Sequence, residues 1–503
     1  MLDLLIAPIV VPALVAPLTL LLMRRRRVFS LYLSLGGCVA LLAVAIALFA
    51  TAQDDAVRSY ALGAWPAPFG IVLVLDRLAA TMLVLTAVLA LVVLAHAVVT
   101  AADRKGWHFH PMFHFQLLGL NGAFLTGDLF NLFVFFEVLL IASYGLMLHS
   151  QGAQRLKAGV AYVVINITGS ALFLVALGLL YGLTSTLNMA DLSRKVALLG
   201  AGDQGLLRVA GLLLVTVFAL KAAVVPLHLW LPRTYGATRP VVAALFAIMT
   251  KLGVYAMIRT VPLIFGARAG AAAWITAPFL LPAAAVGAIL GFVGALTARG
   301  LREQAAFAVL ASTGTLLMAV SRWQQATLAA SLYYLVQATL AGAALFLVAD
   351  VTLRRRGQYA DAIVPGPRFA GQDAAGLLYL AAAVAVVGLP PLAGFVGKLL
   401  ILDASFGVPG WQVIWASLLI ATLIGTLAFS RAGSTLFWAA PADADAIAGH
   451  RRSPLEFAAP LALLATSALL TIAAGWATAQ AEATARQIMA PARYAAAILG
   501  PAR

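Results

Sequence analysis

The stretch KAAVVPLHLWLP, residues 221–232, lies in a part of the chain that is otherwise almost continuously apolar. It places Lys221 and Pro226 inside a segment with the composition of a membrane-spanning helix. Proline removes a backbone hydrogen-bond donor and obstructs the preceding helical turn, so we expect a helix broken just beyond Lys221. Backbone groups freed at membrane depth are tolerated only where protein or a water-filled cavity surrounds them. The break therefore predicts water beside Lys221.

The composition of the whole chain is that of an integral membrane protein. Of its 503 residues, 63% are hydrophobic and 10% are charged, against roughly 25% charged in soluble domains. Apolar runs of about 20 residues, each long enough to cross about 30 Å of hydrocarbon as an α-helix, recur along the chain. The segments between them are too short for a separate soluble domain. The sequence predicts a single all-α membrane domain, residues 1–503.

We predict fourteen spans, with centres near residues 13, 40, 85, 119, 139, 171, 214, 250, 285, 314, 338, 387, 419 and 467. The chain then divides into three N-terminal spans (1–105), a first unit (106–265), a second unit (266–432) and a C-terminal helix with a tail (433–503). The first apolar run precedes its basic block, Arg24–Arg27, which favours a helix over a signal peptide. The single cysteine, Cys38, indicates neither a disulfide nor a metal cluster.

Lysine and arginine residues are unequally divided between the two sets of loops. Loops after odd-numbered spans hold nineteen of them, and the opposite loops with both termini hold ten. Cytoplasmic loops carry the excess of such residues, so we place both termini outside. The net charge of +15 is thereby explained by topology. No basic groove or arm is present, so we expect no nucleic-acid binding.

Four charged residues lie well inside predicted spans: Glu137, Lys221, Lys251 and Lys398. Each costs roughly 3 kcal/mol or more at the bilayer centre, and such residues usually mark an ion or proton path. A purely structural set of buried ion pairs is the alternative.

Glu137 ends the stretch DLFNLFVFFE, residues 128–137. We expect Asp128 to cap the helix of the fifth span, which puts Glu137 about 13 Å deeper along the helix. A carboxylate at that depth needs a facing cation, and Lys221 is the partner that we expect. Separating the two charges weakens the hold of the lysine on its proton, so a change of distance becomes proton release.

A second interrupted span occurs in GLPPLAGFVGK, residues 388–398, where Pro390 and Pro391 precede Lys398. Paired interrupted helices in corresponding halves are typical of inverted repeats and of their transport sites. We predict two inverted five-helix repeats, formed by spans 4–8 and 9–13, with spans 7 and 12 broken.

Lys251, Tyr255 and Arg259 are four residues apart and share one helix face, which we expect to lead from the membrane centre to the outer end. Arg259 reaching the interface is the alternative. Asp76 and Arg77, at the outer start of the third span, are predicted to form a local ion pair or anchor.

Histidines are the remaining candidates. His228 titrates near neutral pH and is a candidate relay base; a hydrogen bond to the broken helix is the alternative. The cluster His108, His110 and His114 resembles metal-ligand spacing only loosely, and we favour an interfacial belt of histidine and aromatic residues.

Two stretches carry a family resemblance: TGDLFNLFVFFEVLLIASYGLM (residues 126–147) and LKAAVVPLHLWLPRTYGATRPVVAALFAIMTKLGVYAMIRT (residues 220–260). They closely resemble the D subunits of Mrp-type multisubunit cation/proton antiporters, and more distantly the M and N subunits of respiratory complex I. The resemblance implies that Glu137 and Lys221 are the ion pair of a first half-channel. It also implies that Lys251 is a central relay lysine and Lys398 the terminal lysine of the second half.

The second half departs from the family pattern. Relatives commonly carry histidine around Gln337 and Ala338, lysine at Gly342, and histidine or glutamine at Ser312. The second half therefore keeps its terminal lysine but has no titratable residue in the middle of its path. Water, Gln337 and Thr339 bridge the gap by hydrogen bonding, or this half conducts poorly, or a partner subunit supplies the route.

The function that we expect is proton translocation in a secondary transporter, not an enzyme, that exchanges protons for sodium or potassium ions. The resemblance implies other subunits of a hetero-oligomeric complex as partners, membrane lipid around the spans, a bacterial inner membrane location, and no cofactor or metal. One alternative is a proton-pumping subunit of an NADH–quinone oxidoreductase or hydrogenase-type complex. Another is a scaffold whose second half has degenerated. The exchanged cation and the chain that carries it are open at this point.

Overall fold

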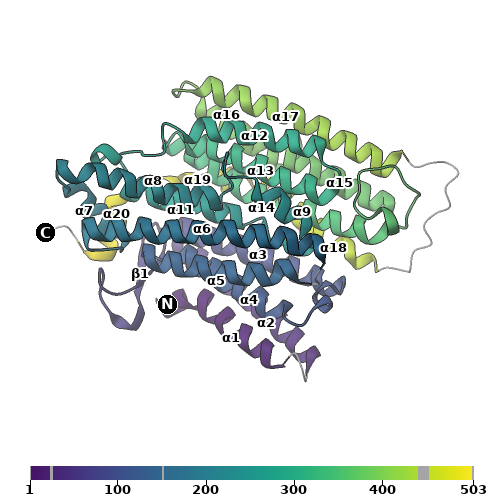
Figure 1. Ribbon diagram of the computed structural model, residues 1–503, viewed down its shortest axis with the longest axis horizontal. Coiled ribbons are helices and arrows are strands. Elements are labelled where there is room, and N and C mark those ends of the chain that lie inside the picture. The colour runs from purple at the N-terminus through teal and green to yellow at the C-terminus, as the bar shows by residue number, and fades with distance from the viewer. Residues whose placement is uncertain (1, 23–25, 150–151, 440–452, 501–503) are drawn as a thin grey trace.

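Long helices that run side by side make up most of the chain in the computed structural model (Figure 1). The structure describes residues 2–22, 26–149, 152–439 and 453–500. The N-terminal part holds three long helices, α1 (Ala7–Leu22), α2 (Arg27–Thr51) and α3 (Arg77–Val99). A short antiparallel hairpin of β1 (Arg58–Ala61) and β2 (Val72–Leu75) joins α2 to α3.

The first unit contains α4 (Phe109–Leu125), α5 (Leu129–Leu148), α6 (Ala153–Thr184), α7 (Met189–Lys195), α8 (Gln204–Lys221), α9 (Trp230–Ala237), α10 (Pro240–Phe246) and α11 (Met249–Ile264). The second contains α12 (Leu280–Thr297), α13 (Leu301–Val320), α14 (Gln325–Arg355), α15 (Gln372–Val387), α16 (Ala393–Ser405) and α17 (Trp411–Gly433). In both units the fourth crossing is interrupted, between α8 and α9 and between α15 and α16. The predicted breaks in spans 7 and 12 are confirmed.

The number of crossings agrees with the sequence. Twelve helical segments of the described chain are long and apolar enough to span a membrane. The 17-residue helix α4 and the interrupted pair α15–α16 add the other two. The part of the chain that the structure describes therefore accounts for fourteen crossings, and the protein is a multi-pass, all-α membrane protein. The predicted fold class is confirmed.

Small residues bring the first two helices of each unit into close contact. A Cβ atom added to Gly119 of α4 would lie 2.5 Å from the Cβ of Leu139 on α5. In the second unit, a Cβ on Gly291 of α12 would collide with the backbone of Ala311 on α13. Close helix approach at small residues is the usual packing mode inside membranes. The two units share this contact, as expected of repeats.

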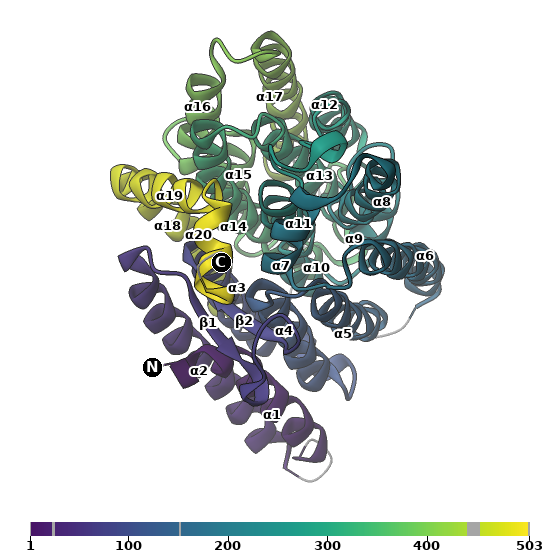
Figure 2. The same ribbon diagram turned by 90° about the vertical axis from the view of Figure 1, so that its left-hand side faces the viewer.

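The C-terminal part differs from the predicted helix and tail. It contains α18 (Ala458–Ile472), α19 (Ala474–Ile488) and α20 (Pro491–Leu499). The amide of Ala473 donates to Leu469 and the amide of Ala477 donates to Ala473, so α18 and α19 form one bent crossing. This crossing packs against α14 and α3 (Figure 2). Helix α20 then packs on α7 and the β1 strand.

Both chain ends lie at the same end of the helix bundle (Figure 1), as an even number of crossings requires. The side of the membrane that this end faces stays a prediction from the charge distribution. Several residues used in that prediction lie outside the described residues, namely Arg24, Arg25, Arg451, Arg452 and Arg503.

The close contact of α12 with α13 gives a stability prediction. Gly291→Ala forces the two backbones apart, which we expect to cost about 1–3 kcal/mol and to lower the thermal unfolding temperature of the purified protein. Gly178→Ala on α6 is the matched control, because no atom lies within 4 Å of its added Cβ. Equal unfolding temperatures for the two variants would contradict this packing.

Candidate functional site

The first pair of intramembrane charges is held by one neighbouring helix. The hydroxyl of Ser170 on α6 donates to Oε1 of Glu137 on α5. The ammonium of Lys221, the last residue of α8, donates to Oδ1 of Asn166 at 2.9 Å. Asn166 and Ser170 are one helical turn apart and therefore face the same way. Helix α6 thus supplies a neutral polar partner to each charge.

The direct Glu137–Lys221 ion pair expected from the sequence is not formed in this conformation. Among the described residues, Glu137 has no cationic group within 4.0 Å. Its side chain is partly exposed, whereas Lys221 is buried. Asn166 and Ser170 solvate the two charges separately, which is the physical reason for the difference. Asp128, by contrast, caps α5 as predicted, with its carboxylate accepting from the amide of Asn131 at 2.9 Å.

The break after Lys221 is satisfied from within the protein. The indole of Trp230, the first residue of α9, donates to the carbonyl of Leu220 at 3.0 Å. The amide of Val224 donates to the carbonyl of Ala219 at 2.9 Å. Lys221 stands at the C-terminal end of α8, where the helix dipole favours a cation. His228 lies half-buried in the break, and its Nδ1 atom is buried without a hydrogen-bond partner among the described residues.

Lys251 on α11 is completely buried. Its ammonium donates to the hydroxyls of Ser312 at 2.9 Å and Thr313 at 3.3 Å on α13. Ser312, which the sequence marked only as a departure from the family, is thus a direct partner of the central lysine. Gly253 lets α11 approach α8 closely, because a Cβ at this position would lie 2.5 Å from the backbone nitrogen of Ala222. Helix α11 therefore packs directly on the break in α8.

The helix face beyond Lys251 ends in a buried ion pair. Tyr255 donates to the carbonyl of Phe124 at 2.6 Å and accepts from Arg259 at 3.1 Å. Arg259 in turn makes a two-pronged ion pair with Asp76. Both charged side chains are buried, so Arg259 does not reach the interface. Asp76 also caps α3, and it pairs across the bundle instead of with its neighbour Arg77.

Arg77 acts as an anchor, which is one of the two roles that the sequence predicts for it. Its guanidinium pairs with Asp55 and donates to the side-chain oxygens of Gln53 at 3.0 Å and Gln480 at 2.7 Å. Gln480 lies on α19, so Arg77 ties the N-terminal end of α3 to the C-terminal crossing.

Lys398 on α16 lies at the second break. Its ammonium donates to the carbonyl of Val387, the last residue of α15, and to the hydroxyl of Thr422 on α17, both at 2.7 Å. The side-chain amide of Gln337 on α14 donates to the carbonyl of Ala385 at 2.7 Å. Gln337 and Lys398 therefore satisfy the last turn of the broken helix. Ala338, beside Gln337, is apolar.

Comparison with known proteins identifies the family of this chain. The model described as NADH:quinone oxidoreductase/Mrp antiporter, TM, matches residues 126–425. The chain belongs to this family. It is 36% identical to the D subunit of a probable K(+)/H(+) antiporter of Rhizobium meliloti over 536 residues, covering 100% of this chain and 98% of the relative. It is also 36% identical to the D subunit of the Na(+)/H(+) antiporter of Alkalihalophilus pseudofirmus over 406 residues, covering 80% and 81%.

A solved structure of an Mrp complex from a Dietzia species contains a chain with the same fold. The TM-score is 0.87 at 27% sequence identity, and the match covers 99% of this chain and 100% of the other. The resemblance to Mrp-type D subunits that the two sequence stretches carried is confirmed.

Sequence reasoning missed the neutral partners. Asn166 and Ser170 lie in YVVINITGSALF, residues 162–173, where two polar residues four apart in an apolar span are a visible signal. Thr313 and Thr422 gave no comparable signal, because single threonines are common in apolar helices. Their partners are also distant in the sequence.

The contact between Lys251 and Ser312 gives a second stability prediction. Ser312→Ala removes one of two hydroxyls that solvate a buried ammonium, at a cost of about 1.5–3 kcal/mol. We expect a lower unfolding temperature for Ser312→Ala alone, and almost no further loss when it is added to Lys251→Met. Ser331→Ala is the control, because the Ser331 hydroxyl bonds the carbonyl of Leu328 on its own helix. An equal cost of Ser312→Ala in both backgrounds would refute the contact.

Proposed function

We propose that this chain is the proton-translocating subunit of a multisubunit monovalent cation/proton antiporter. The observation that carries the proposal is the state of three buried lysines. Among the described residues, Lys221, Lys251 and Lys398 form no ion pair within 4.0 Å, and their ammonium groups bond only neutral oxygens. Glu137 begins the series, and His228, in the break after Lys221, is a candidate relay base.

Neutral partners suit a group that must give up and regain a proton. A carboxylate beside a lysine favours the charged amine and resists its deprotonation. A serine or threonine hydroxyl accepts from an ammonium and, after rotation, donates to a neutral amine. Ser312 and Thr313 offer Lys251 both arrangements, and Thr422 offers Lys398 the same. The buried pair of Arg259 with Asp76 is the contrast, since arginine does not deprotonate in proteins.

The arrangement around α6 supports a coupling between the first two charges. Glu137 and Lys221 are each bonded to a different residue of the same helix, one turn apart. A small shift of α6 relative to α5 and α8 therefore exchanges these neutral contacts for a direct contact between the charges. The lysine holds its proton more firmly in direct contact and releases it more readily when the contact is broken. In this proposal, that change drives the proton from Lys221 to Lys251.

The second half carries the proton from Lys251 to Lys398 in this proposal. Its middle is formed by Gln337, Ala338 and Gly342, which do not titrate. A proton therefore crosses this stretch on water or through a neighbouring chain of the complex. The relatives from Rhizobium meliloti and Alkalihalophilus pseudofirmus are named as antiporter subunits, and the Dietzia structure is of an Mrp complex. We extend to this chain a hetero-oligomeric complex in a bacterial inner membrane with both termini outside.

The exchanged cation is sodium or potassium, the two ions named for those relatives. The respiratory alternative is a proton-pumping subunit of an NADH–quinone oxidoreductase or hydrogenase-type complex. It has less support than the antiporter, because these relatives are named as antiporter subunits.

Substitution of Lys221 or of Glu137 tests the proposal. The chain is expressed with its neighbouring genes in a host lacking other antiporters, and cation-induced collapse of a respiration-generated pH gradient is measured in everted vesicles. We expect Lys221→Ala and Glu137→Ala to abolish the response to sodium or potassium while the complex still assembles. Lys157→Ala, at an exposed lysine of α6, is the control and should retain exchange. Full exchange in either site variant would refute these roles.

The role of α6 is tested separately in the same assay. Ser170→Ala removes the hydroxyl that donates to the Glu137 carboxylate, a charged hydrogen bond whose loss costs about 1.5–3 kcal/mol. We expect exchange to slow by roughly tenfold or more. Thr168→Ala on the same helix is the matched control, because its exposed hydroxyl bonds only the carbonyl of Val164 in its own helix. Equal slowing in the two variants would remove Ser170 from the mechanism.

A further inference from the structure

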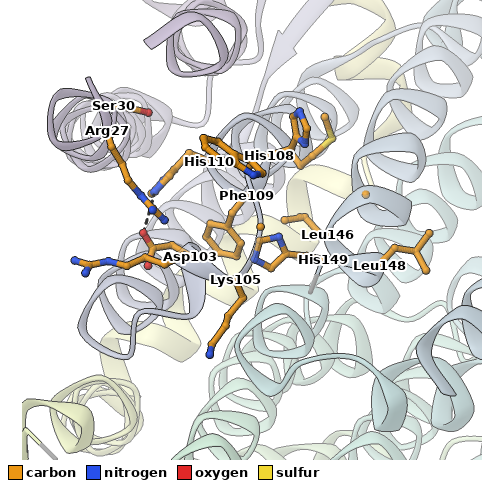
Figure 3. Close-up of a pocket in the computed structure, with 15 residues that line it drawn as sticks. Arg27, Ser30, Asp103, Lys105, His108, Phe109, His110, Leu146, Leu148 and His149 are labelled. Carbon is orange, nitrogen blue, oxygen red and sulfur yellow. Dashed lines mark ion pairs between the residues drawn. The ribbon is translucent and has the colours of Figure 1, made fainter. Parts of the chain in front are cut away.

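A cavity of about 810 Å³ is lined by residues of the N-terminal part and of the first unit, and none of the buried lysines belongs to its lining (Figure 3). It is bounded by the start of α2, the short helix Ala102–Lys105 after α3, the start of α4 and the end of α5. These segments belong to the loops that the charge distribution assigns to the cytoplasm.

The polar part of the cavity lining is mainly cationic. Arg27, Arg104 and Lys105 belong to it, and all three side chains are exposed. The one carboxylate in the lining, Asp103, is buried and lies 3.4 Å from Nε2 of His110. The exposed cationic groups therefore outnumber the acidic ones, and the acidic group already has a partner. The cavity as a whole attracts anions.

The histidine at the floor of the cavity is fixed in place. His149 donates from Nε2 to the carbonyl of Ala102 at 3.1 Å. Burial lowers the pKa of His149, chiefly by removing water from the ring, so the imidazole is neutral near pH 7. The His149 ring therefore forms a fixed part of the lining and adds no charge to it. The cationic character of the cavity thus comes from Arg27, Arg104 and Lys105.

Another part of the lining is apolar. Met112 of α4 and Leu146 and Leu148 of α5 form it, and Figure 3 shows the two leucines on the side away from Arg27. Trp107, which is part of the lining, is 69% exposed, and Phe29, next to the lining residue Ser30 on α2, is 56% exposed. Aromatic side chains of this kind sit at the level of lipid headgroups. The lining therefore passes from cationic to apolar across one cavity at the membrane boundary.

We propose that this cavity binds an anionic phospholipid, with its anionic headgroup among the exposed basic side chains of the lining, Arg27, Arg104 and Lys105, and its glycerol backbone against Met112, Leu146 and Leu148. Basic pockets between membrane helices recognise anionic headgroups through this combination of charges and hydrocarbon. A free phosphate ion would use the basic side chains alone and leave the apolar part of the lining in water. The apolar part of the lining and the exposed aromatic residues therefore favour the lipid over the soluble anion.

The test counts lipids bound to the whole purified complex. The complex in detergent is titrated with dioleoylphosphatidylglycerol, and bound lipids are counted by native mass spectrometry. The variant Arg104→Gln/Lys105→Gln removes two exposed charges, which leaves the packing of the helices intact. The control Lys157→Gln/Arg233→Gln removes two exposed charges from the same predicted side but outside the cavity lining.

We expect the first variant to lose one tightly held anionic lipid, with affinity at that site reduced roughly tenfold or more, and the control to match the wild type. Dioleoylphosphatidylcholine should not occupy the site. Equal binding by the variant and the control would overturn the proposal. So would inorganic phosphate that displaces the lipid at millimolar concentration, because the site would then belong to a soluble anion.

Discussion

A helix broken inside a membrane must find partners for its freed backbone groups, and this requirement organises the centre of the molecule. Hydrocarbon offers no hydrogen bonds, so the partners come from the protein. Trp230 bonds the carbonyl of Leu220 at the first break, and Lys398 and Gln337 bond the last carbonyls of α15 at the second. Lys221 ends α8, where the helix dipole favours its charge. The breaks and the intramembrane lysines are therefore parts of one arrangement.

Two kinds of buried charge follow from this arrangement. Arg259 and Asp76 form a paired, hydrogen-bonded unit that joins α11 to α3 and whose charges are fixed. Lys251 lies one turn before Tyr255 on the same helix as Arg259, yet it bonds only hydroxyls. A paired charge holds helices together, whereas an unpaired one on neutral oxygens tolerates the loss of its proton. The same helix thus combines a structural charge with a transferable one.

The sequence predicts those features of the structure that depend on residues close together in the chain. Apolar runs gave the fourteen crossings, prolines gave both breaks, and Asp128 was recognised as the cap of α5. What depends on packing between distant segments was missed. The ion pair of Asp76 with Arg259 joins residues far apart in the chain, and Glu137 and Lys221 meet α6 instead of each other. The C-terminal segment has no strong apolar run beyond α18, so its sequence predicts a tail where the structure has α19 and α20.

The two units keep a common backbone but differ in their chemistry. Asp128 at the start of α5 bridges to Asn188, and Gly300 at the start of α13 bridges to Ala362 in the same way. Val309 stands as far along α13 from Gly300 as Glu137 stands along α5 from Asp128, so a valine takes the place of the carboxylate. Close helix packing constrains Gly119 and Gly291, because a Cβ on either glycine would meet the backbone of the neighbouring helix. Lys251, by contrast, bonds only the side-chain hydroxyls of Ser312 and Thr313, so the chemistry at such a position depends on its neighbouring side chains. The symmetry of the fold therefore does not require two equivalent proton paths.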